Sequence, residues 1–165
     1  MKKIILSLLL LLPLGLFAQE LKIAFVDQNQ LFAVMPEVSE MESQLATKRK
    51  EYEDALKLMQ EDYYRKAEDL QQRVDSLTEN IRKVRVQELQ ELEYRMENLS
   101  KIGQEDFTKL QESLFAPIQD KVTKAINAVG EENGYSCIML PQIFLFKGKN
   151  IIDATPQVMA KLGLK

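Results

Sequence analysis

The sequence predicts an α+β protein in which a long antiparallel helical hairpin projects from a small β-rich body. Apolar residues recur at three- and four-residue steps over residues 37–118, which is the period of a helix with one buried stripe. A narrow stripe on so long a helix has to pack against a partner helix, as in a coiled coil. Short runs of β-forming residues flank this segment on both sides. The flanking runs therefore form the body, and the helical segment forms an arm.

These patterns divide the chain into three parts. Residues 1–18 have the character of a signal peptide. Residues 19–36 and 116–165 form the β-rich oligomerisation body, and residues 37–115 form the arm, with its tip near residues 75–80.

The first 18 residues predict a cleaved secretory signal peptide. Lys2 and Lys3 precede an apolar run over residues 4–12, and Ala18 offers a small residue at the cleavage site. The run is shorter than the ~20 residues that cross a bilayer. Cleavage after Ala18 gives an exported chain that begins at Gln19 and carries 20 basic and 25 acidic residues.

The body begins with a strand over residues 21–26 and a short helix over residues 28–35. Asp27 or Asn29 is expected to cap this helix, because a short polar side chain can accept a hydrogen bond from a free N–H of the first turn. Pro36 suits the start of the first long helix, where a missing N–H removes no hydrogen bond.

The reversal of the arm is predicted from capping residues. The run Ser76-Leu77-Thr78-Glu79 has the spacing of a capping box, with Ser76 as N-cap and Thr78 as the alternative cap. A reversal there gives two helices of about 38 residues, each roughly 57 Å long. No Gly or Pro occurs from Glu37 to Ile102, so one unbroken helix is the competing interpretation.

Interruptions in the apolar stripe predict loose packing between the arm helices. Lys48 stands where the register expects an apolar residue, and the steps from Met59 to Leu70 approach an eleven-residue repeat, which locally unwinds a supercoil. Loose packing would leave flexible Met and amphipathic Tyr side chains available for unspecific apolar contacts, with packing inside the hairpin as the alternative role. The candidate contact residues are Met41, Tyr52, Met59, Tyr63 and Met96.

The second arm helix is expected to enter the body at a proline. Its apolar phase passes through Pro117, which predicts a kink there. Gly134 suits the left-handed conformation that ends a helix. A last helix is predicted from Thr155 as N-cap, with Pro156 at its first position, to about Leu162.

Strands are predicted over residues 135–140, 143–146 and 150–152, the last two joined by a turn. Residues 143–146 are apolar at every position, so a strand there needs cover on both faces. One subunit is too small to provide that cover, and we expect other copies of the chain to complete the body. The expected body residues are Ile23, Phe25, Ile138, Leu140, Phe144 and Phe146. Cys137 begins an apolar run and is expected to be buried and unreactive.

The composition argues against catalysis and against cofactor or metal binding. The chain has no His and a single Cys, so the commonest general base and the thiolate metal cluster are both missing. No Gly-rich phosphate loop follows a predicted strand. The acidic net charge also argues against nucleic acid as a partner. We therefore expect a binding or structural protein rather than an enzyme.

The charge of the arm differs from that of its tip. Residues 37–118 contain 13 basic and 19 acidic residues, whereas basic residues gather at the tip. Such a cluster could contact anionic lipid headgroups or acidic client segments, with helix solubility as the alternative. The four basic residues are Arg73, Arg82, Lys83 and Arg85.

Three groups of residues carry a resemblance to a known family. They comprise residues 22–27 with Leu31-Phe32 and Pro36-Glu37; Pro117-Ile118 with Lys121, Ala125-Ile126, Val129 and residues 132–135; and Asp153-Ala154-Thr155 with Val158 and Leu162. In the arm, Arg82-Lys83 and residues 88–92 add weaker matches. Together they resemble the Skp (OmpH) family of periplasmic chaperones, over essentially the whole mature chain.

The resemblance implies a periplasmic homotrimer whose strands form a β-barrel body. Three helical hairpins would project from that body and hold unfolded outer-membrane proteins in the cavity between them, without ATP. Lipopolysaccharide is a further partner that the resemblance suggests, although the family's lipopolysaccharide site has no residue-by-residue match here.

Two other functions fit parts of the sequence. A structural or adaptor coiled coil of the cell envelope would use the same long arms to tether folded partners. A cytosolic chaperone of the prefoldin type also carries helical hairpins on a β body, but it would have to keep residues 1–18 uncleaved.

Overall fold

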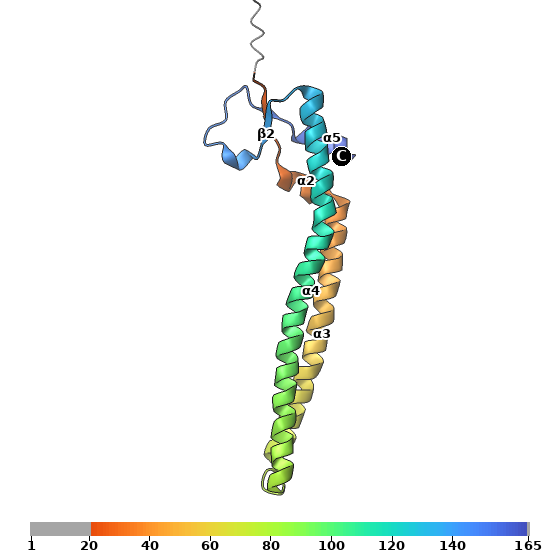
Figure 1. Ribbon diagram of the computed structural model, residues 1–165, viewed down its shortest axis with the longest axis vertical. Coiled ribbons are helices and arrows are strands. Elements are labelled where there is room, and N and C mark those ends of the chain that lie inside the picture. The colour runs from red at the N-terminus through yellow and green to blue at the C-terminus, as the bar shows by residue number, and fades with distance from the viewer. Residues whose placement is uncertain (1–20, 165) are drawn as a thin grey trace, which may run out of the picture.

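The computed structural model describes residues 21–164, so the predicted signal peptide and its cleavage site lie outside the described residues. A long pair of helices projects from a small head that contains the other elements (Figure 1). In chain order the elements are β1 (Ile23–Phe25), α2 (Gln28–Val34), α3 (Pro36–Arg73), α4 (Glu79–Asn133), β2 (Cys137–Met139), the 3-10 turn η2 (Pro141–Ile143), β3 (Ile152–Asp153) and α5 (Thr155–Leu162).

The arm consists of α3 and the first part of α4, which run antiparallel and side by side (Figure 1). The chain reverses between Arg73 and Glu79, so the alternative of a single unbroken helix is wrong. Thr78, not Ser76, caps α4, since its side-chain oxygen accepts a hydrogen bond from the Ile81 N–H at 3.4 Å. The Ser76 hydroxyl instead donates to the Arg73 carbonyl and helps to end α3.

α4 has 55 residues and continues from the tip into the head as one helix (Figure 1). Pro117 lies inside it, and the buried residues of the head begin at the next position, Ile118. Gly134 ends the helix with a φ of 63°, in the left-handed region that its sequence position predicted.

The three strands form one parallel sheet in the order β2-β1-β3. In the register of this sheet, Ala24 of β1 is the partner of both Ile138 in β2 and Ile152 in β3. β1 therefore lies in the centre, while the outer edges of β2 and β3 have no strand neighbour among the described residues.

The core of the head lies on one face of β1. Ala24 and Val26 point into it and are almost fully buried, because alternate residues of a strand face the same side. α2, α5 and the head portion of α4 cover this face. Their buried residues are Leu31, Met35, Ile118, Val122, Ala125, Val129, Ala154 and Val158.

Phe25 faces the opposite side of the sheet, where the chain after β2 covers it. The Phe25 ring makes an edge contact with Phe144 at 6.4 Å between ring centroids, and the Lys147 ammonium lies 3.8 Å from the centre of the Phe25 ring. Phe25 is only 6% exposed as a result.

A hydrogen-bonded node joins the end of β1 to the start of α5. The Asp27 N–H donates to the Thr155 hydroxyl at 3.0 Å, and the Ala154 N–H donates to the Phe25 carbonyl at 2.9 Å. Asp27 also caps α2, because its carboxylate accepts from the N–H groups of Asn29 and Gln30. Two of the three segments that carry the family resemblance thus meet at one point.

The strand predicted over residues 143–146 is wrong. Pro141–Ile143 forms a 3-10 turn, and the residues after it have no regular structure until β3. Pro141 lacks an N–H for a sheet ladder, and Ile143, Leu145 and Phe146 are 62%, 106% and 83% exposed. The head of one chain is accordingly less rich in strand than predicted, with only short β1, β2 and β3 among the described residues.

Two further predictions need correction. Cys137 is exposed in the single chain, because it lies at the beginning of the edge strand β2 and not in the core. α5 begins at Thr155, so its N-cap is Ala154 and not Thr155. The Asp153 carboxylate accepts a hydrogen bond from the Thr155 N–H at 2.9 Å and takes the role of the cap.

Candidate functional site: the helical arm

The seam between the two arm helices is only half-buried along most of its length. Among the residues of α3, all of which the structure describes, Leu45 alone is buried. In the arm portion of α4, the only buried residue is Gly103. A two-helix arm has no third layer to cover its seam, so apolar surface stays accessible from the tip to the head.

The predicted apolar contact residues all lie half-buried in this seam. Met41 packs against the edge of the head core, near the root of the arm. Tyr52, Met59 and Tyr63 on α3 and Met96 on α4 follow toward the tip. Each of these side chains therefore both packs against the partner helix and presents part of its surface to solvent.

Several strongly exposed apolar side chains of the arm are not among the predicted contact residues. Leu58, Tyr64, Tyr94 and Ile102 are 67%, 60%, 64% and 51% exposed. Ile102 lies on the three- and four-residue steps of the apolar stripe, so its spacing alone predicts burial, and its exposure contradicts that prediction. Leu58 and Tyr64 fall outside the three- and four-residue steps of that stripe, and this mismatch is the signal that could have identified them.

Four polar contacts join the arm helices among the described residues. At the root, the Lys121 ammonium pairs with the Glu37 carboxylate, and this hydrogen bond lowers the pKa of Glu37 below its ordinary value. At the tip, the Arg82 guanidinium donates to the Val74 carbonyl at 2.7 Å, which is an orphan acceptor at the end of α3. The other two contacts are made by tyrosines in the middle of the arm.

Both tyrosine contacts run from α3 to a carboxylate on α4. The Tyr52 hydroxyl donates to Asp106 at 2.6 Å, and the Tyr63 hydroxyl donates to Glu93 at 2.7 Å. These hydrogen bonds raise the pKa of each tyrosine above its ordinary value, because they stabilise the protonated phenol. Lys48, the irregular residue of the stripe, lies with its ammonium 5.2 Å from the centre of the Tyr52 ring.

The predicted basic cluster lies at the arm tip, but each member has a partner there. Arg73 pairs with Asp69 at 2.9 Å, Lys83 with Glu79 at 3.0 Å and Arg85 with Glu88 at 3.0 Å, each within its own helix. Arg82 holds the Val74 carbonyl. Exposed pairs of this kind are weak, so they reduce the positive potential of the tip without fixing the side chains.

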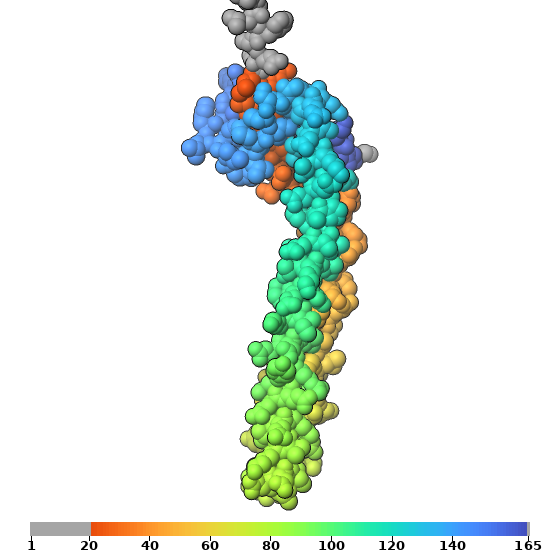
Figure 2. All heavy atoms as spheres, viewed as in Figure 1, coloured from red at the N-terminus to blue at the C-terminus, as the bar shows by residue number. Residues whose placement is uncertain are grey.

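The expected body residues occupy both faces of the sheet and the segment beyond it. Phe25 is buried, Ile23, Ile138 and Phe144 are half-buried, and Leu140 and Phe146 are exposed. In Figure 2, the segment of residues 140–150 bulges from the head on the side opposite α5. Leu140, Ile143, Leu145 and Phe146 form an apolar surface there that the single chain does not cover.

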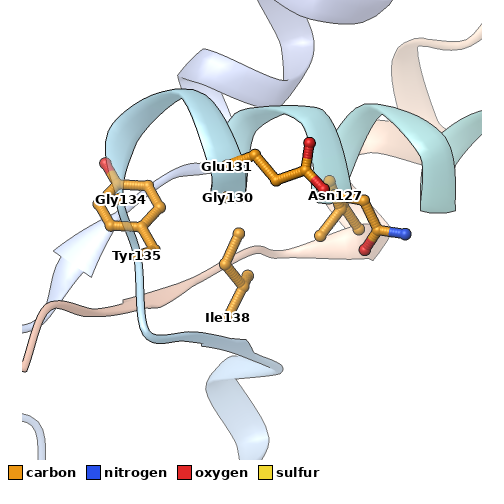
Figure 3. A pocket seen from close by; sticks show the side chains of 7 residues that line it. Asn127, Gly130, Glu131, Gly134, Tyr135 and Ile138 are labelled. Atoms are coloured by element: carbon orange, nitrogen blue, oxygen red, sulfur yellow. The ribbon is translucent and has the colours of Figure 1, made fainter.

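A hollow of about 360 Å³ lies between the end of α4 and β2. Figure 3 shows Ile138 pointing from β2 toward the helix, below Gly130 and Glu131, with Tyr135 at one end. A second hollow continues past Ile126 and Ile138 to Leu140. Both hollows therefore lie between β2 and α4.

Metal centres and membrane-spanning helices are both absent from the described residues. No group of three or more His, Cys, Asp or Glu residues there is arranged to hold a metal ion. None of the helices in that part of the chain is long and apolar enough to cross a membrane.

A family model described as outer membrane protein (OmpH-like) matches residues 22–162. No curated protein matches the chain. The matched region includes β1, both arm helices, the remaining strands and α5, and therefore nearly every described residue. The chain belongs to the OmpH-like family, which is the Skp (OmpH) family.

Proposed function

We propose that this protein is an ATP-independent periplasmic holdase chaperone, which binds unfolded outer-membrane proteins between its arms and prevents their aggregation. The observation that carries the proposal is the half-buried seam of a long projecting arm, in a chain of the OmpH-like family. Unfolded membrane proteins expose dispersed apolar side chains, and a long apolar seam offers many weak contacts to them instead of one pocket.

The chemistry of the seam and of the exposed side chains beside it suits unspecific binding. Met59 and Met96 are unbranched and polarizable, so they adapt to side chains of different shape. Tyr64 and Tyr94 combine an apolar ring with a polar tip and are largely exposed. Holding a client in this way acts by mass action on the unfolded state and requires no nucleotide.

Three copies of the chain would assemble through the edges of the sheet. The outer edges of β2 and β3 expose unpaired backbone groups, and an open edge invites another strand. Pairing β2 of one copy with β3 of the next is a head-to-tail contact, which forms a closed ring when the rotation permits. Three copies give nine strands, close to the roughly eight at which a barrel is filled by its own side chains. The apolar surface of Leu140, Ile143, Leu145 and Phe146 follows β2 in the chain and would be covered by the neighbouring copy.

We place the mature protein in the periplasm, after cleavage of residues 1–18. The basic start and short apolar run of that segment support export, and the family of the chain agrees with this location. The mass of the protein recovered from the periplasmic fraction tests the assignment. A chain that keeps Met1 and stays in the cytoplasm would contradict it.

The decisive experiment dilutes a urea-unfolded outer-membrane β-barrel protein into buffer that contains the mature chaperone at one trimer per client. We expect light scattering from aggregates to be suppressed. A variant with Leu58, Tyr64, Tyr94 and Ile102 all changed to Ser should suppress it less, because these are exposed arm side chains whose loss leaves the seam packed. If the purified protein leaves the light scattering from client aggregates unchanged, the holdase proposal is wrong.

An envelope adaptor remains the second candidate. The four polar contacts along the arm favour it, because they hold the helices in one register, as a tether for folded partners requires. Capture of one folded partner, together with no affinity for the unfolded client, would favour the adaptor over the holdase.

A further inference from the structure

The Tyr52 ring of α3 packs against Gly103 of α4. A Cβ atom at Gly103 would lie 2.9 Å from the Tyr52 Cδ1 atom and 3.0 Å from Cγ, which is closer than real Cβ contacts. Gly103 is buried although it has no side chain, so the ring itself covers this stretch of α4. The missing side chain at Gly103 therefore lets an aromatic ring pack directly on the backbone of the opposite helix.

Because its ring packs on Gly103, Tyr52 directs its hydroxyl at one acceptor, the Asp106 carboxylate. The hydroxyl donates to Asp106, three residues beyond Gly103 on α4, at 2.6 Å. The ring is fixed by the helix backbone below it, and the hydroxyl is fixed by the carboxylate. Tyr63 makes the corresponding bond to Glu93 at 2.7 Å, farther toward the tip.

The two bonds reach opposite sides of α4. Tyr52 and Tyr63 are 11 residues apart, so at about 100° per residue they lie within roughly 20° of each other on α3. Asp106 and Glu93 are 13 residues apart, which places them roughly 140° apart around α4. Two tyrosines on one face of α3 thus form hydrogen bonds with acceptors on opposite sides of α4.

Apolar packing alone leaves rotation of α4 about its own axis poorly determined. The seam is half-buried, and its Met side chains can repack around a rotated partner. A pair of hydrogen bonds on opposite flanks resists rotation in both directions, because rotation either way lengthens one of them. Directional hydrogen bonds therefore select one rotation of α4, which adaptable apolar contacts do not.

We propose that Tyr52–Asp106 and Tyr63–Glu93 are opposed braces that fix the rotation of α4 against α3, with Gly103 as the seat of the first brace. The middle of the arm is then a stiff section, and the braces determine which apolar side chains of α4, such as Tyr94 and Ile102, face outward. These hydrogen bonds lie within the arm of one chain, so their role does not depend on the protein being a holdase.

The test measures a distance across the arm by pulsed electron paramagnetic resonance. Spin labels are attached to Lys57→Cys on α3 and Lys101→Cys on α4, two exposed positions, in a Cys137→Ser background. Labelled chains are diluted with an excess of unlabelled chains, so that only distances within one chain are measured. Tyr52→Phe and Tyr63→Phe remove each hydroxyl and keep the ring.

We expect each single variant to broaden the distance distribution, and the double variant to broaden it more than either. Tyr94→Phe is the matched control, because Tyr94 is exposed and makes no side-chain hydrogen bond among the described residues; its distribution should not change. Circular dichroism checks that every variant keeps its helix content. A double variant whose distribution equals that of the parent overturns the proposal.

Discussion

A single hydroxyl connects three parts of the head. Thr155 is 2% exposed, and its side-chain oxygen accepts the N–H of Asp27, which itself caps α2. The backbone N–H of Thr155 is held by the Asp153 carboxylate at the end of β3. β1, β3 and the starts of two helices therefore depend on one residue for their relative positions.

Thr155→Val tests this node, because valine has the shape of threonine and lacks the hydroxyl. The Asp27 N–H would lose its partner inside the head, and we expect a loss of about 1–3 kcal/mol in the free energy of unfolding. Urea denaturation at a fixed protein concentration measures the loss. Thr155→Ser keeps the acceptor and should lose clearly less. Equal losses in both variants would mean that packing of the methyl group, and not the hydrogen bond, matters.

Replacing Gly103 by Ala tests the packing of Tyr52, because we expect the change in stability to have the opposite sign to the usual one. Replacing Gly by Ala inside a helix ordinarily stabilises it by about 0.5–1 kcal/mol. At Gly103 the new methyl would overlap the Tyr52 ring, and overpacking costs about 1–3 kcal/mol. We therefore expect Gly103→Ala to destabilise the arm by about 1 kcal/mol in urea denaturation.

Gly130→Ala is the matched control in the same helix. A Cβ atom there would lie 3.4 Å from Ile138 Cδ1, which is ordinary contact. This substitution should leave stability unchanged or raise it slightly. If Gly103→Ala stabilises the protein as much as Gly130→Ala does, Tyr52 is not seated on Gly103.

At the scale of elements, local signals predicted the helices well. The three- and four-residue steps and Gly134 with its positive φ are properties of a few neighbouring residues, although the first choice of N-cap for α4, Ser76, is wrong and Thr78, the alternative, is the cap. The extent of the arm helices follows from such signals, and so does the position of α5 within one residue.

Strands and exposure were harder to predict, because they depend on partners distant in sequence. Residues 143–146 have a strong β pattern and yet form no strand in one chain, since no neighbouring strand offers them hydrogen bonds. Cys137 is exposed for a related reason, because it lies on the edge strand β2, whose outer side has no strand neighbour among the described residues. In the arm, the tyrosine braces could not be predicted either. Their acceptors, Asp106 and Glu93, are charged residues outside the apolar pattern.

The root of the arm contains an ion pair that is sensitive to acid. Lys121 lowers the pKa of Glu37, so the folded state holds the charged carboxylate more tightly than the unfolded chain does. This contribution to stability is complete above the ordinary pKa of a glutamate. It is lost as the pH falls through the lower pKa of the folded state.

We therefore expect the stability of the protein to fall more steeply in acid than that of Glu37→Gln, which has no carboxylate to protonate. Urea midpoints measured at a series of pH values below 7 give the two slopes. Lys121→Met should remove most of the same part of the slope, since it removes the largest cause of the lowered Glu37 pKa. Parallel curves for all three proteins would show that the Glu37–Lys121 pair makes no contribution to the pH dependence of stability.

At the scale of the whole molecule, charge and apolar surface are distributed differently. The arm is acidic overall, and its basic tip residues are paired with acidic residues or with backbone. Long-range attraction of an acidic client or lipid is therefore weak, and it would be screened further by salt. Apolar surface, in contrast, extends along the arm seam and over the segment of residues 140–150. The first of these surfaces is the one that the proposed holdase function would use, and the second follows the edge strand β2 in the chain.

Assembly of three copies can be tested through the second surface alone. Leu145 and Phe146 are 106% and 83% exposed in one chain, so changing both to Ser removes no packing within that chain. Covering them in a neighbouring copy would contribute roughly 1.5–3 kcal/mol for each side chain, and this gain would be lost in the variant. We expect light scattering to give the mass of a trimer for the parent and a smaller mass for Leu145→Ser/Phe146→Ser at the same micromolar concentration.

The control changes as much apolar surface on the arm. Leu58→Ser/Tyr94→Ser lies away from the sheet edges and should keep the trimer mass, while circular dichroism should show unchanged helix content in both variants. A trimer that survives Leu145→Ser/Phe146→Ser would mean that the strand edges hold the copies together without this segment. A parent protein that is monomeric at this concentration would contradict the closed barrel itself, because the open edges of β2 and β3 would then remain unpaired in solution.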